Sequence, residues 1–407
     1  MKPKPIETIA EAERRAKRRL PKAIFDFLVA GSEKGITIHA NVEAFDQIGF
    51  RPRPLAVRPL QRDLGTKVLG MDLAFPVIVA PAGAQAIDPG GEVAVARASA
   101  AVGIPIGVSS FASQPFELIV RENPNALWQL YLVGTRNQIA ERIERARKAN
   151  ARALILTVDE SFAPRKDWGT PSIPERINLA TLLKYAPMAL SRLGWTLRWV
   201  RTGFPDLKVP NLANSSTGVP TFKQAFQTWV ASPLPTWEEV RWVRQLWSGS
   251  LVVKGITHPE DARRAVQAGA DAISVSNHGG NNLDGTPASL RFLPEIVEAV
   301  GNAVTVLFDG GIRRGADVAK ALALGARAVL VGRAWLFGLA AGGEAGVRQI
   351  LEILRNGIDE SLIGLGHSSV RELSRQDLVI PDGFVISTEQ AENWRAGASV
   401  LIPADQR

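Results

Sequence analysis

A histidine at the end of an apolar run is the first residue of this sequence that could do chemistry. The stretch Ile273–Gly285 opens with β-branched residues, reaches His278 and passes into a turn rich in glycine and asparagine. The chain has only 4 histidines. The pattern predicts a strand that delivers one imidazole to the mouth of a fold. The alternative is a histidine that merely caps a strand end with a hydrogen bond.

Two further residues could make this imidazole a general base. Asp159 closes another apolar run, and a carboxylate on one ring nitrogen would fix the tautomer and stabilise the protonated ring. Tyr131 closes a third run and could hydrogen-bond a substrate oxygen or nitrogen, although a tyrosine at the edge of the core is the plainer interpretation. We therefore expect His278, Asp159 and Tyr131 to be the catalytic residues.

A lysine at the end of the run 251–255 predicts a redox cofactor. Burying Lys254 without a partner would be costly, so either a neighbouring carboxylate pairs with it or it faces a group that becomes anionic. A flavin ring becomes anionic on reduction, and we favour this second explanation. Further groups around the ring are expected from the turn after residue 80 and from other strand ends, namely Ala82, Ser109, Gln129, Thr157 and Ser276.

Glycine and arginine after two later runs predict a phosphate site. Asp309-Gly310-Gly311-Ile312-Arg313-Arg314-Gly315 follows one run, and Gly332-Arg333 follows the next. Glycines let backbone N–H groups approach an anion, a following helix adds positive potential, and arginine binds phosphate in a bidentate way. The cofactor residues expected here are Asp309, Gly310, Gly311, Arg313, Gly332 and Arg333.

The elements that must position these residues repeat eight times. Apolar runs at 77–80, 104–108, 127–131, 153–159, 251–255, 272–278, 304–309 and 326–332 each lead into a turn. Helical patterns follow at 91–102, 115–122, 135–149, 259–268, 287–300, 314–324 and on to residue 365. Continuous apolar strands alternating with helices predict an α/β fold, a parallel (β/α)8 TIM barrel, whose chemistry lies at the carboxyl ends of the strands.

The remaining segments surround this barrel, which we place at 76–365. Residues 6–30 read as helix split at Pro21, and 31–75 look irregular apart from a hairpin near Val68–Leu73, so 1–75 forms an N-terminal helical and irregular segment packing on the barrel. Residues 366–407 form a C-terminal tail. A Trp-rich insert, 160–237, follows the fourth strand and holds Trp168, Trp195, Trp199, Trp229 and Trp237.

Three roles are open for this insert. It could pack on the barrel top or on a neighbouring subunit, which is the plainest interpretation, or it could close over substrate as a lid. The segment Leu182–Val200 is also aromatic, basic and amphipathic enough to touch a membrane surface, which is the least favoured of the three.

Composition excludes several classes of protein. The absence of cysteine from the 407 residues excludes disulfides, thiolate metal sites and cysteine nucleophiles. The net charge of +8 is spread out, so no nucleic-acid partner is predicted. No signal peptide and no stable membrane insertion are expected, which predicts a cytoplasmic protein, and no metal site is predicted.

The residues resemble the FMN-dependent 2-hydroxy acid oxidase and dehydrogenase family, which includes glycolate oxidase and the flavin lactate dehydrogenases. The matching motifs run in order through nearly the whole chain: Leu20-Pro21-Lys22, Phe50-Arg51-Pro52-Arg53, Gln129-Leu130-Tyr131, Leu156-Thr157-Val158-Asp159, Val253-Lys254-Gly255, Ser276-Asn277-His278-Gly279 and Asp309-Gly310-Gly311-Ile312-Arg313-Arg314-Gly315. The resemblance implies a (β/α)8 barrel with FMN at its mouth, a histidine base and a homotetramer.

Three departures from the family concern substrate binding. The family usually has arginine where this chain has Asn281, tyrosine where it has Phe25, and arginine where it has Lys166, with Arg165 adjacent. The resemblance implies that such side chains bind the substrate carboxylate in hydroxy-acid oxidases. A lysine does not replace a bidentate arginine, so the substrate is not expected to be a simple hydroxy acid.

The segments Asn277–Pro287 and Lys166–Gly169, with the Trp-rich insert, are similar to one branch of the family. This resemblance implies FMN-dependent oxidative deamination of an aminolactam, which has an acidic C–H but no carboxylate. Phe25, Tyr131, Lys166, His278 and Asn281 are then the expected substrate contacts, because an amide such as Asn281 can both donate and accept.

Three other functions remain open from the sequence. The chain could be a true 2-hydroxy acid oxidase or dehydrogenase of the lactate or mandelate type, with an unusual and bulky aromatic acid. It could be a flavin-binding or electron-transfer protein without a small substrate. It could also be a barrel that binds no flavin, in which case the purified protein would lack flavin absorbance.

Overall fold

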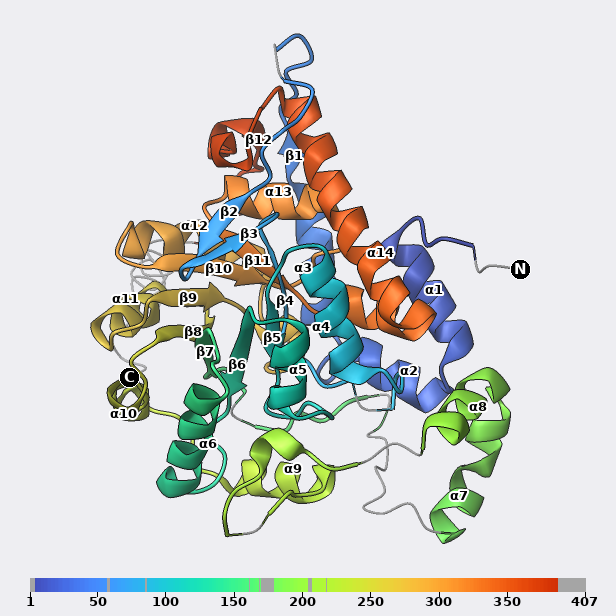
Figure 1. Ribbon diagram of the computed structural model, residues 1–407. Helices are drawn as coiled ribbons and strands as arrows, with labels where there is room; N and C mark the ends of the chain where they lie inside the picture. Colours follow the sequence, from blue (N-terminus) through green and yellow to red (C-terminus); the bar gives the residue numbers. More distant parts are fainter. Residues whose placement is uncertain are drawn as a thin grey trace, which may run out of the picture.

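A closed barrel of eight parallel strands forms the centre of the computed structural model, with strand order β10-β11-β4-β5-β6-β7-β8-β9 (Figure 1). The structure describes residues 4–56, 59–84, 86–160, 162–167, 169, 179–203, 207–216 and 218–386. The predicted (β/α)8 barrel is confirmed. Its strands are β4 (Val77–Val79), β5 (Ile106–Val108), β6 (Ala126–Leu130), β7 (Ala153–Thr157), β8 (Ser250–Ile256), β9 (Ala272–Val275), β10 (Thr305–Asp309) and β11 (Ala328–Val331).

Helices cover the outside of the barrel, close to the ranges that the sequence predicts. These are α4 (Gly91–Ala101), α5 (Phe116–Glu122), α6 (Arg136–Lys148), α11 (Pro259–Gln267), α12 (Ser289–Val300), α13 (Gly315–Ala323) and α14 (Arg333–Leu365). Local signals fix several ends: α6 begins at a capping box formed by Thr135 and Gln138. The long α14 is kinked at Gly343, whose φ is +63°.

The N-terminal segment contains one helix that the sequence did not reveal. Helices α1 (Ile9–Arg19) and α2 (Lys22–Val29) are separated at Pro21, as predicted. The expectation of an irregular 31–75 is wrong for α3 (Ile36–Gln47). Its N-cap is Gly35, which has no side chain for the task. The Asp284 carboxylate instead accepts the N–H groups of residues 35, 36 and 37 at 2.9, 3.1 and 2.9 Å, from 247 or more residues away.

A small hairpin closes the end of the barrel away from the predicted site. Strands β2 (Thr66–Val68) and β3 (Met71–Leu73) pair in antiparallel fashion, which confirms the predicted hairpin (Figure 1). Leu69 and Gly70 turn the chain with φ of +51° and +76°. Val68, Met71 and Leu73 are buried in one cluster with side chains from inside the barrel, so no open channel runs through this end.

The insert after β7 forms a helical layer rather than a structureless loop. Its described elements are α7 (Leu179–Leu190), α8 (Leu193–Thr202), η1 (Pro210–Leu212), α9 (Phe222–Ala231) and the start of α10 (Trp237–Leu246). Trp195 donates to the Ala86 carbonyl at 2.8 Å, and Arg198 pairs with Asp88 at 2.6 Å. These bonds tie α8 to the loop after β4. Trp168 lies outside the described residues.

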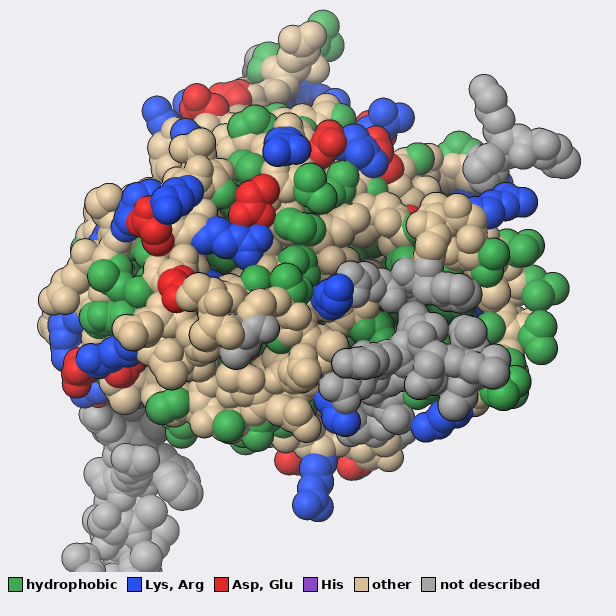
Figure 2. Space-filling view, turned by 60° about the horizontal axis from the view of Figure 1, so that its bottom comes forward, with side chains coloured by type: hydrophobic (Ala, Val, Ile, Leu, Met, Phe, Trp, Pro, Cys, Tyr) green, Lys and Arg blue, Asp and Glu red, His purple; other side chains and the backbone are tan. Residues whose placement is uncertain are grey.

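Apolar side chains remain exposed on the helical hairpin α7–α8. They gather at the right margin of Figure 2, where α7 and α8 lie in Figure 1, and are Leu183, Leu190, Leu193, Leu197 and Val200. None of the described helices is both long and apolar enough to cross a bilayer. The three roles considered for the insert therefore remain open for this hairpin.

The C-terminal segment returns to the N-terminal one. It passes through η3 (Val370–Glu372) and η4 (Arg375–Asp377) to β12 (Leu378–Val379). Strand β12 pairs in antiparallel fashion with β1 (Gly49–Phe50). The last part of the predicted tail, 387–407, lies outside the described residues. The division of the chain at 75/76 and 365/366 stays a prediction.

Candidate active site

Polar side chains from different strands meet at one mouth of the barrel. Parallel strands in a closed barrel all end on the same side, so residues far apart in sequence converge there. Many of the residues that the sequence predicts as a site are buried at this mouth: Ser109, Gln129, Tyr131, Thr157, Lys254, Ser276 and Asp309.

The predicted pair of His278 and Asp159 is formed. Nδ1 of His278 lies 3.0 Å from Oδ1 of Asp159, and their side chains are 20% and 9% exposed. Burial lowers the pKa of His278, but Asp159 and Glu160 outweigh burial and leave this pKa above its ordinary value. Burial raises the pKa of Asp159, but His278 and Lys254 outweigh it and leave this pKa lowered. The pair can therefore take up and stabilise a proton on the imidazole.

Backbone geometry at two positions makes this pair possible. His278 has a φ of +55°, in the left-handed region, and its N–H donates to Ser276 Oγ at 3.0 Å. Gly255 has a φ of +110°, and a Cβ there would lie 2.5 Å from the Cβ of Asp159. The register of β8 against β9 shifts at this glycine, between Lys254 and Ile256. Gly255, which the sequence placed in a motif but not in the site, thus makes room for Asp159.

The other ring nitrogen of His278 faces two polar groups. Its Nε2 lies 3.4 Å from the Tyr131 hydroxyl and 3.6 Å from Oε2 of Glu160. Burial, with Glu160 and Asp159 adding to it, raises the pKa of Tyr131 well above its ordinary value, so the phenol stays protonated and can donate. Sequence reasoning missed Glu160. Its position directly after Asp159 was the available signal.

Lys254 pairs with a neighbouring carboxylate. This was the less favoured of the two explanations that the sequence offered for a buried lysine. Its Nζ donates to Ser276 Oγ at 2.8 Å and lies 3.3 Å from Oδ2 of Asp309, while Ser276 donates to Oδ1 of Asp309 at 2.8 Å. Burial lowers the pKa of Lys254, but Asp309 and Asp159 outweigh it and leave this pKa raised. The lysine is therefore a fixed buried cation, and this pairing does not prevent it from facing a cofactor.

A second network joins neighbouring strand ends. Gln129 accepts from the Ser110 N–H at 2.9 Å and donates to Thr157 at 3.1 Å. Ser109 accepts the N–H of residue 111 at 3.1 Å. Ser110, which was not predicted, also donates to the Gln129 carbonyl at 2.7 Å and accepts the N–H of Tyr131 at 3.2 Å. These bonds hold the β5 and β6 ends in one arrangement.

The structure supports an anion site at Arg313 and Arg333. Burial, with Arg313 adding to it, lowers the pKa of Arg333 to about 9, and burial lowers the pKa of Arg313 as well. Arg333 donates to the carbonyls of Gly279 and Ala30 at 2.7 and 2.8 Å, while its Nε is buried without a partner. In the described part of the chain, no carboxylate forms a salt bridge with either guanidinium. Both line a cavity of about 1420 Å³ between the N-terminal helices and α13–α14.

The glycines beside these arginines have a structural cause. A Cβ at Gly311 would lie 1.9 Å from the carbonyl oxygen of Asn41 in α3, and one at Gly310 would lie 2.3 Å from Ser289 Oγ. The N–H groups of Arg313 and Arg314 donate to Asp317 at 2.8 and 2.9 Å. The Arg314 side chain pairs with Asp46 at 3.2 Å. Within the predicted phosphate loop, the Arg313 side chain rather than these two N–H groups is therefore available to an anion.

The predicted substrate residues lie in different settings. Phe25 is 7% exposed and packs in the main hydrophobic core. Lys166 donates to the Gly31 carbonyl at 3.1 Å, and Asn281 accepts from Arg333 at 3.4 Å. Ala82 lies in the loop after β4, and Gly332 is the N-cap of α14. Their predicted roles toward substrate or cofactor stay predictions.

Part of the insert roofs Tyr131. The ring of Phe111 lies 5.8 Å from that of Tyr131 and 5.6 Å from that of Phe222 in α9. Val209, Leu212 and Ala225 of the insert belong to the same cluster as Tyr131. This part of the insert therefore packs over Tyr131 as a roof, and whether it also opens as a lid stays a prediction.

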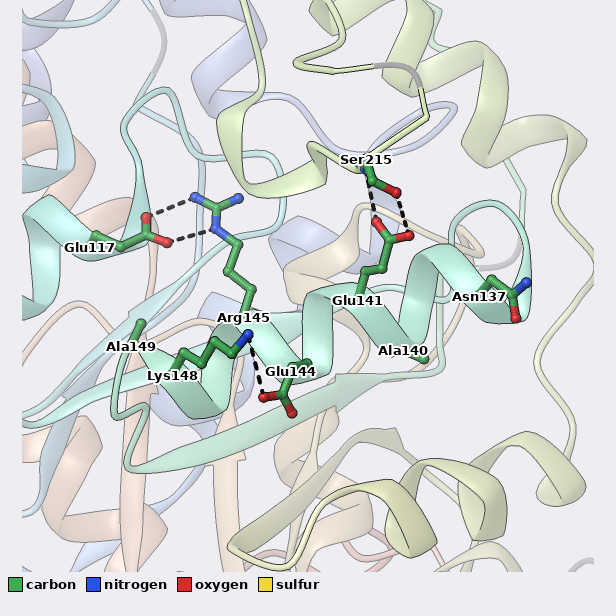
Figure 3. Close-up of a pocket in the computed structure, with 9 residues that line it drawn as sticks. All are labelled: Glu117, Asn137, Ala140, Glu141, Glu144, Arg145, Lys148, Ala149 and Ser215. Atoms are coloured by element: carbon green, nitrogen blue, oxygen red, sulfur yellow. Dashed lines mark hydrogen bonds and ion pairs between the residues drawn. The ribbon is translucent and has the colours of Figure 1, made fainter.

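Figure 3 shows how the roof is attached to the barrel, in a hollow of about 950 Å³ on the outside of α6. Arg145 pairs with Glu117 at 2.7 Å and donates to the Pro210 carbonyl at 2.6 Å. Glu141 accepts from the Ser215 N–H and hydroxyl at 2.9 and 2.6 Å. Because these polar groups are paired and none closes a barrel strand, this hollow is not the candidate site.

Comparison with known proteins agrees with this geometry. Residues 16–380 match the profile of the FMN-dependent dehydrogenase family. Pre-mycofactocin synthase of Mycobacterium tuberculosis is 54% identical over 93% of this chain and 96% of its own, and that of Mycolicibacterium smegmatis is 51% identical over 93% and 95%. Glycolate oxidase 3 of Arabidopsis thaliana is 37% identical over 91% of this chain and 95% of its own.

Solved structures give the same result for the fold. A monotopic membrane protein, (S)-mandelate dehydrogenase, superposes with a TM-score of 0.83 at 32% identity over 92% of this chain and 100% of its own. Mandelate oxidase superposes with a TM-score of 0.76 at 35% identity over 94% of this chain and 100% of its own.

Proposed function

The chain belongs to the FMN-dependent dehydrogenase family, and we propose that it catalyses the oxidative deamination of an aminolactam to pre-mycofactocin in mycofactocin biosynthesis. The proposed substrate is a dimethyl-pyrrolidinone that carries an amine and a hydroxybenzyl group. One observation carries the proposal: 51–54% identity, over 93% of this chain, to proteins named pre-mycofactocin synthase. Glycolate oxidase 3, at 37%, is a more distant relative.

The residues at the barrel mouth fit FMN. The two buried guanidiniums of Arg313 and Arg333 suit a phosphate, since they lack salt bridges to described carboxylates and one Nε has no partner. Lys254 supplies a fixed cation for the ring, and Gln129 and Thr157 supply polar groups for its edge. When bound, FMN accepts two electrons from the substrate and passes them to oxygen, which gives hydrogen peroxide.

The protein's own residues handle the proton and the orientation. The substrate carbon between amine and carbonyl bears the acidic C–H, and Nε2 of His278 removes this proton. Asp159, on the opposite ring nitrogen at 3.0 Å, stabilises the imidazolium that results. The Tyr131 hydroxyl, 3.4 Å from Nε2, hydrogen-bonds the substrate. Loss of two electrons, of this C–H proton and of one N–H proton to water gives an imine, which water hydrolyses to ammonia and the keto lactam.

A direct assay tests this proposal. The FMN-loaded protein is incubated with the aminolactam in air, and mass analysis follows the loss of ammonia and gain of a ketone, with peroxide measured in parallel. We expect one ketone and one peroxide per aminolactam consumed, and no turnover by the His278→Asn variant. An unchanged aminolactam, beside rapid turnover of lactate or mandelate, would show that the protein is a 2-hydroxy acid oxidase instead.

We also propose a cytoplasmic homotetramer. The family resemblance supports the assembly, and the absence of a spanning helix from the described residues is compatible with the location. Light scattering of the FMN-loaded protein should give four times the chain mass of 43.9 kDa. A single-chain mass would contradict the proposed tetramer.

A further inference from the structure

A second carboxylate stands where the substrate must bind. Oε2 of Glu160 lies 3.6 Å from Nε2 of His278, the nitrogen that faces away from Asp159. The Glu160 side chain is 26% exposed, so a ligand can reach it. The hydroxyl of Tyr131 lies 3.4 Å from the same Nε2. A carboxylate, a phenol and the base nitrogen thus surround one point.

The cations of the mouth are engaged with other groups. Lys254 pairs with Asp309, Lys166 donates to the Gly31 carbonyl, and Arg333 donates to the carbonyls of Gly279 and Ala30. Among the residues that the structure describes, no lysine or arginine forms a salt bridge with Glu160. The partners of Glu160 within the protein are the Tyr131 hydroxyl and, when it is protonated, the His278 imidazole. While the imidazole is neutral and able to act as a base, the negative charge of Glu160 is available to a cationic ligand.

This charge favours one class of substrate over another. An amine next to a carbonyl has a pKa of about 8 and is mostly an ammonium at neutral pH. A 2-hydroxy acid would instead bring its own carboxylate close to the Glu160 carboxylate, and two negative charges close together repel each other. This inference rests on the proposed function. We propose that Glu160 binds the ammonium group of the substrate and thereby selects amines over hydroxy acids.

The geometry gives this contact a positioning consequence. An ammonium has three donors, and the Glu160 carboxylate and the Tyr131 oxygen can each accept one. Because both groups adjoin Nε2 of His278, an ammonium held between them brings the carbon that it is attached to near the base. Glu160 is thus a specificity-determining residue, and the base is the neighbouring imidazole.

The Glu160→Gln variant tests this proposal, since glutamine keeps the shape and removes the charge. The KM for the aminolactam should rise about tenfold to a hundredfold, as expected for loss of a hydrogen bond to a charged group. Glu160→Asp should recover part of the loss. Glu352→Gln, which removes an exposed carboxylate from α14, should behave as the unaltered protein. FMN content, read from visible absorbance, should be equal in all four proteins.

A second experiment tests whether Glu160→Gln binds a 2-hydroxy acid more tightly. (S)-Mandelate binding is measured without turnover, as the change in FMN absorbance under anaerobic conditions in a His278→Asn background, with and without Glu160→Gln. Removing the repelling carboxylate should tighten mandelate binding several-fold, while the binding of benzylamine, a simple cationic probe, should weaken. Unchanged dissociation constants for both probes would overturn the inference.

The two proposals fail in different ways. If the unaltered protein leaves the aminolactam unchanged, the proposed function fails, and the mandelate and benzylamine measurements still decide the charge preference of Glu160. If the aminolactam is deaminated and Glu160→Gln keeps the KM of the unaltered protein, the proposed function stands and the role of Glu160 is refuted.

Discussion

At the scale of single residues, the site consists of the groups that surround the imidazole of His278. Asp159 holds Nδ1 at 3.0 Å, while Tyr131 and Glu160 face Nε2. Asp159 and Tyr131 were predictable, because each follows an apolar strand whose end points to the mouth of the barrel. Glu160 was missed: its position directly after Asp159 was a signal, but the sequence does not show that its side chain turns toward a histidine 118 positions later.

The pH dependence of the reaction should follow from Asp159. A base must be neutral to take a proton, so kcat/KM falls as the pH drops below the pKa of His278. Asp159 is the largest influence that raises this pKa. In Asp159→Asn, the acid limb of the kcat/KM profile should therefore move to lower pH, and kcat should fall by about a hundredfold or more.

The profile is measured on variants with full FMN content, so that lost cofactor does not imitate lost catalysis. Glu144→Gln, an exposed change on α6, serves as the control and should leave the acid limb in place. An acid limb that stays fixed in Asp159→Asn would show that Asp159 does not set the pKa of the base.

At the scale of elements, long-range contacts explain what local patterns could not show. The barrel strands and most helices were predictable because apolar periodicity is local. Helix α3 was hidden because its N-terminus is capped by Asp284, which lies across the fold. The role of Gly255 was hidden for the same reason, since the clash that it avoids is with Asp159, just after the neighbouring strand β7.

Gly255 gives a prediction at this scale. Alanine there has to adopt a φ of +110° and would place its Cβ 2.5 Å from that of Asp159. We expect Gly255→Ala to displace Asp159, so that kcat falls at least about tenfold, as it does when a catalytic group is misplaced. The acid limb should also shift toward lower pH, as in Asp159→Asn.

Gly383→Ala separates backbone strain from the clash. Gly383 also has a positive φ, +72°, but nothing lies within 4 Å of a Cβ there. Both variants should lose some stability in urea unfolding, and only Gly255→Ala should lose kcat. Equal kcat values in the two variants would mean that the β8 glycine does not position the carboxylate.

At the scale of the whole molecule, two like charges are buried between the N-terminal helices and the barrel. Arg313 and Arg333 line the same cavity, and each is buried deeply enough to lower its pKa. Such an arrangement is costly without an anion. The stability of the protein should therefore depend on the phosphate of its cofactor.

Removal of FMN should lower the melting temperature, and adding it back should restore it. A ligand at a hundred times its Kd stabilises the folded state by about 2.7 kcal/mol. Riboflavin, which has the same ring without the phosphate, should stabilise the cofactor-free protein much less at equal concentration. Differential scanning calorimetry of the three states measures this. Equal stabilisation by riboflavin and FMN would place the phosphate elsewhere.

The pairing of β4 with β11 has a consequence for how the protein is made. These strands are the first and last of the barrel in sequence, and Val77–Val79 pair in parallel with Val329–Val331. The ring cannot close until about four-fifths of the chain has left the ribosome. Arg313 and Arg333 also emerge late, so FMN cannot bind until most of the chain has been synthesised. Until then the emerging strands have unpaired edges, which the cofactor cannot protect.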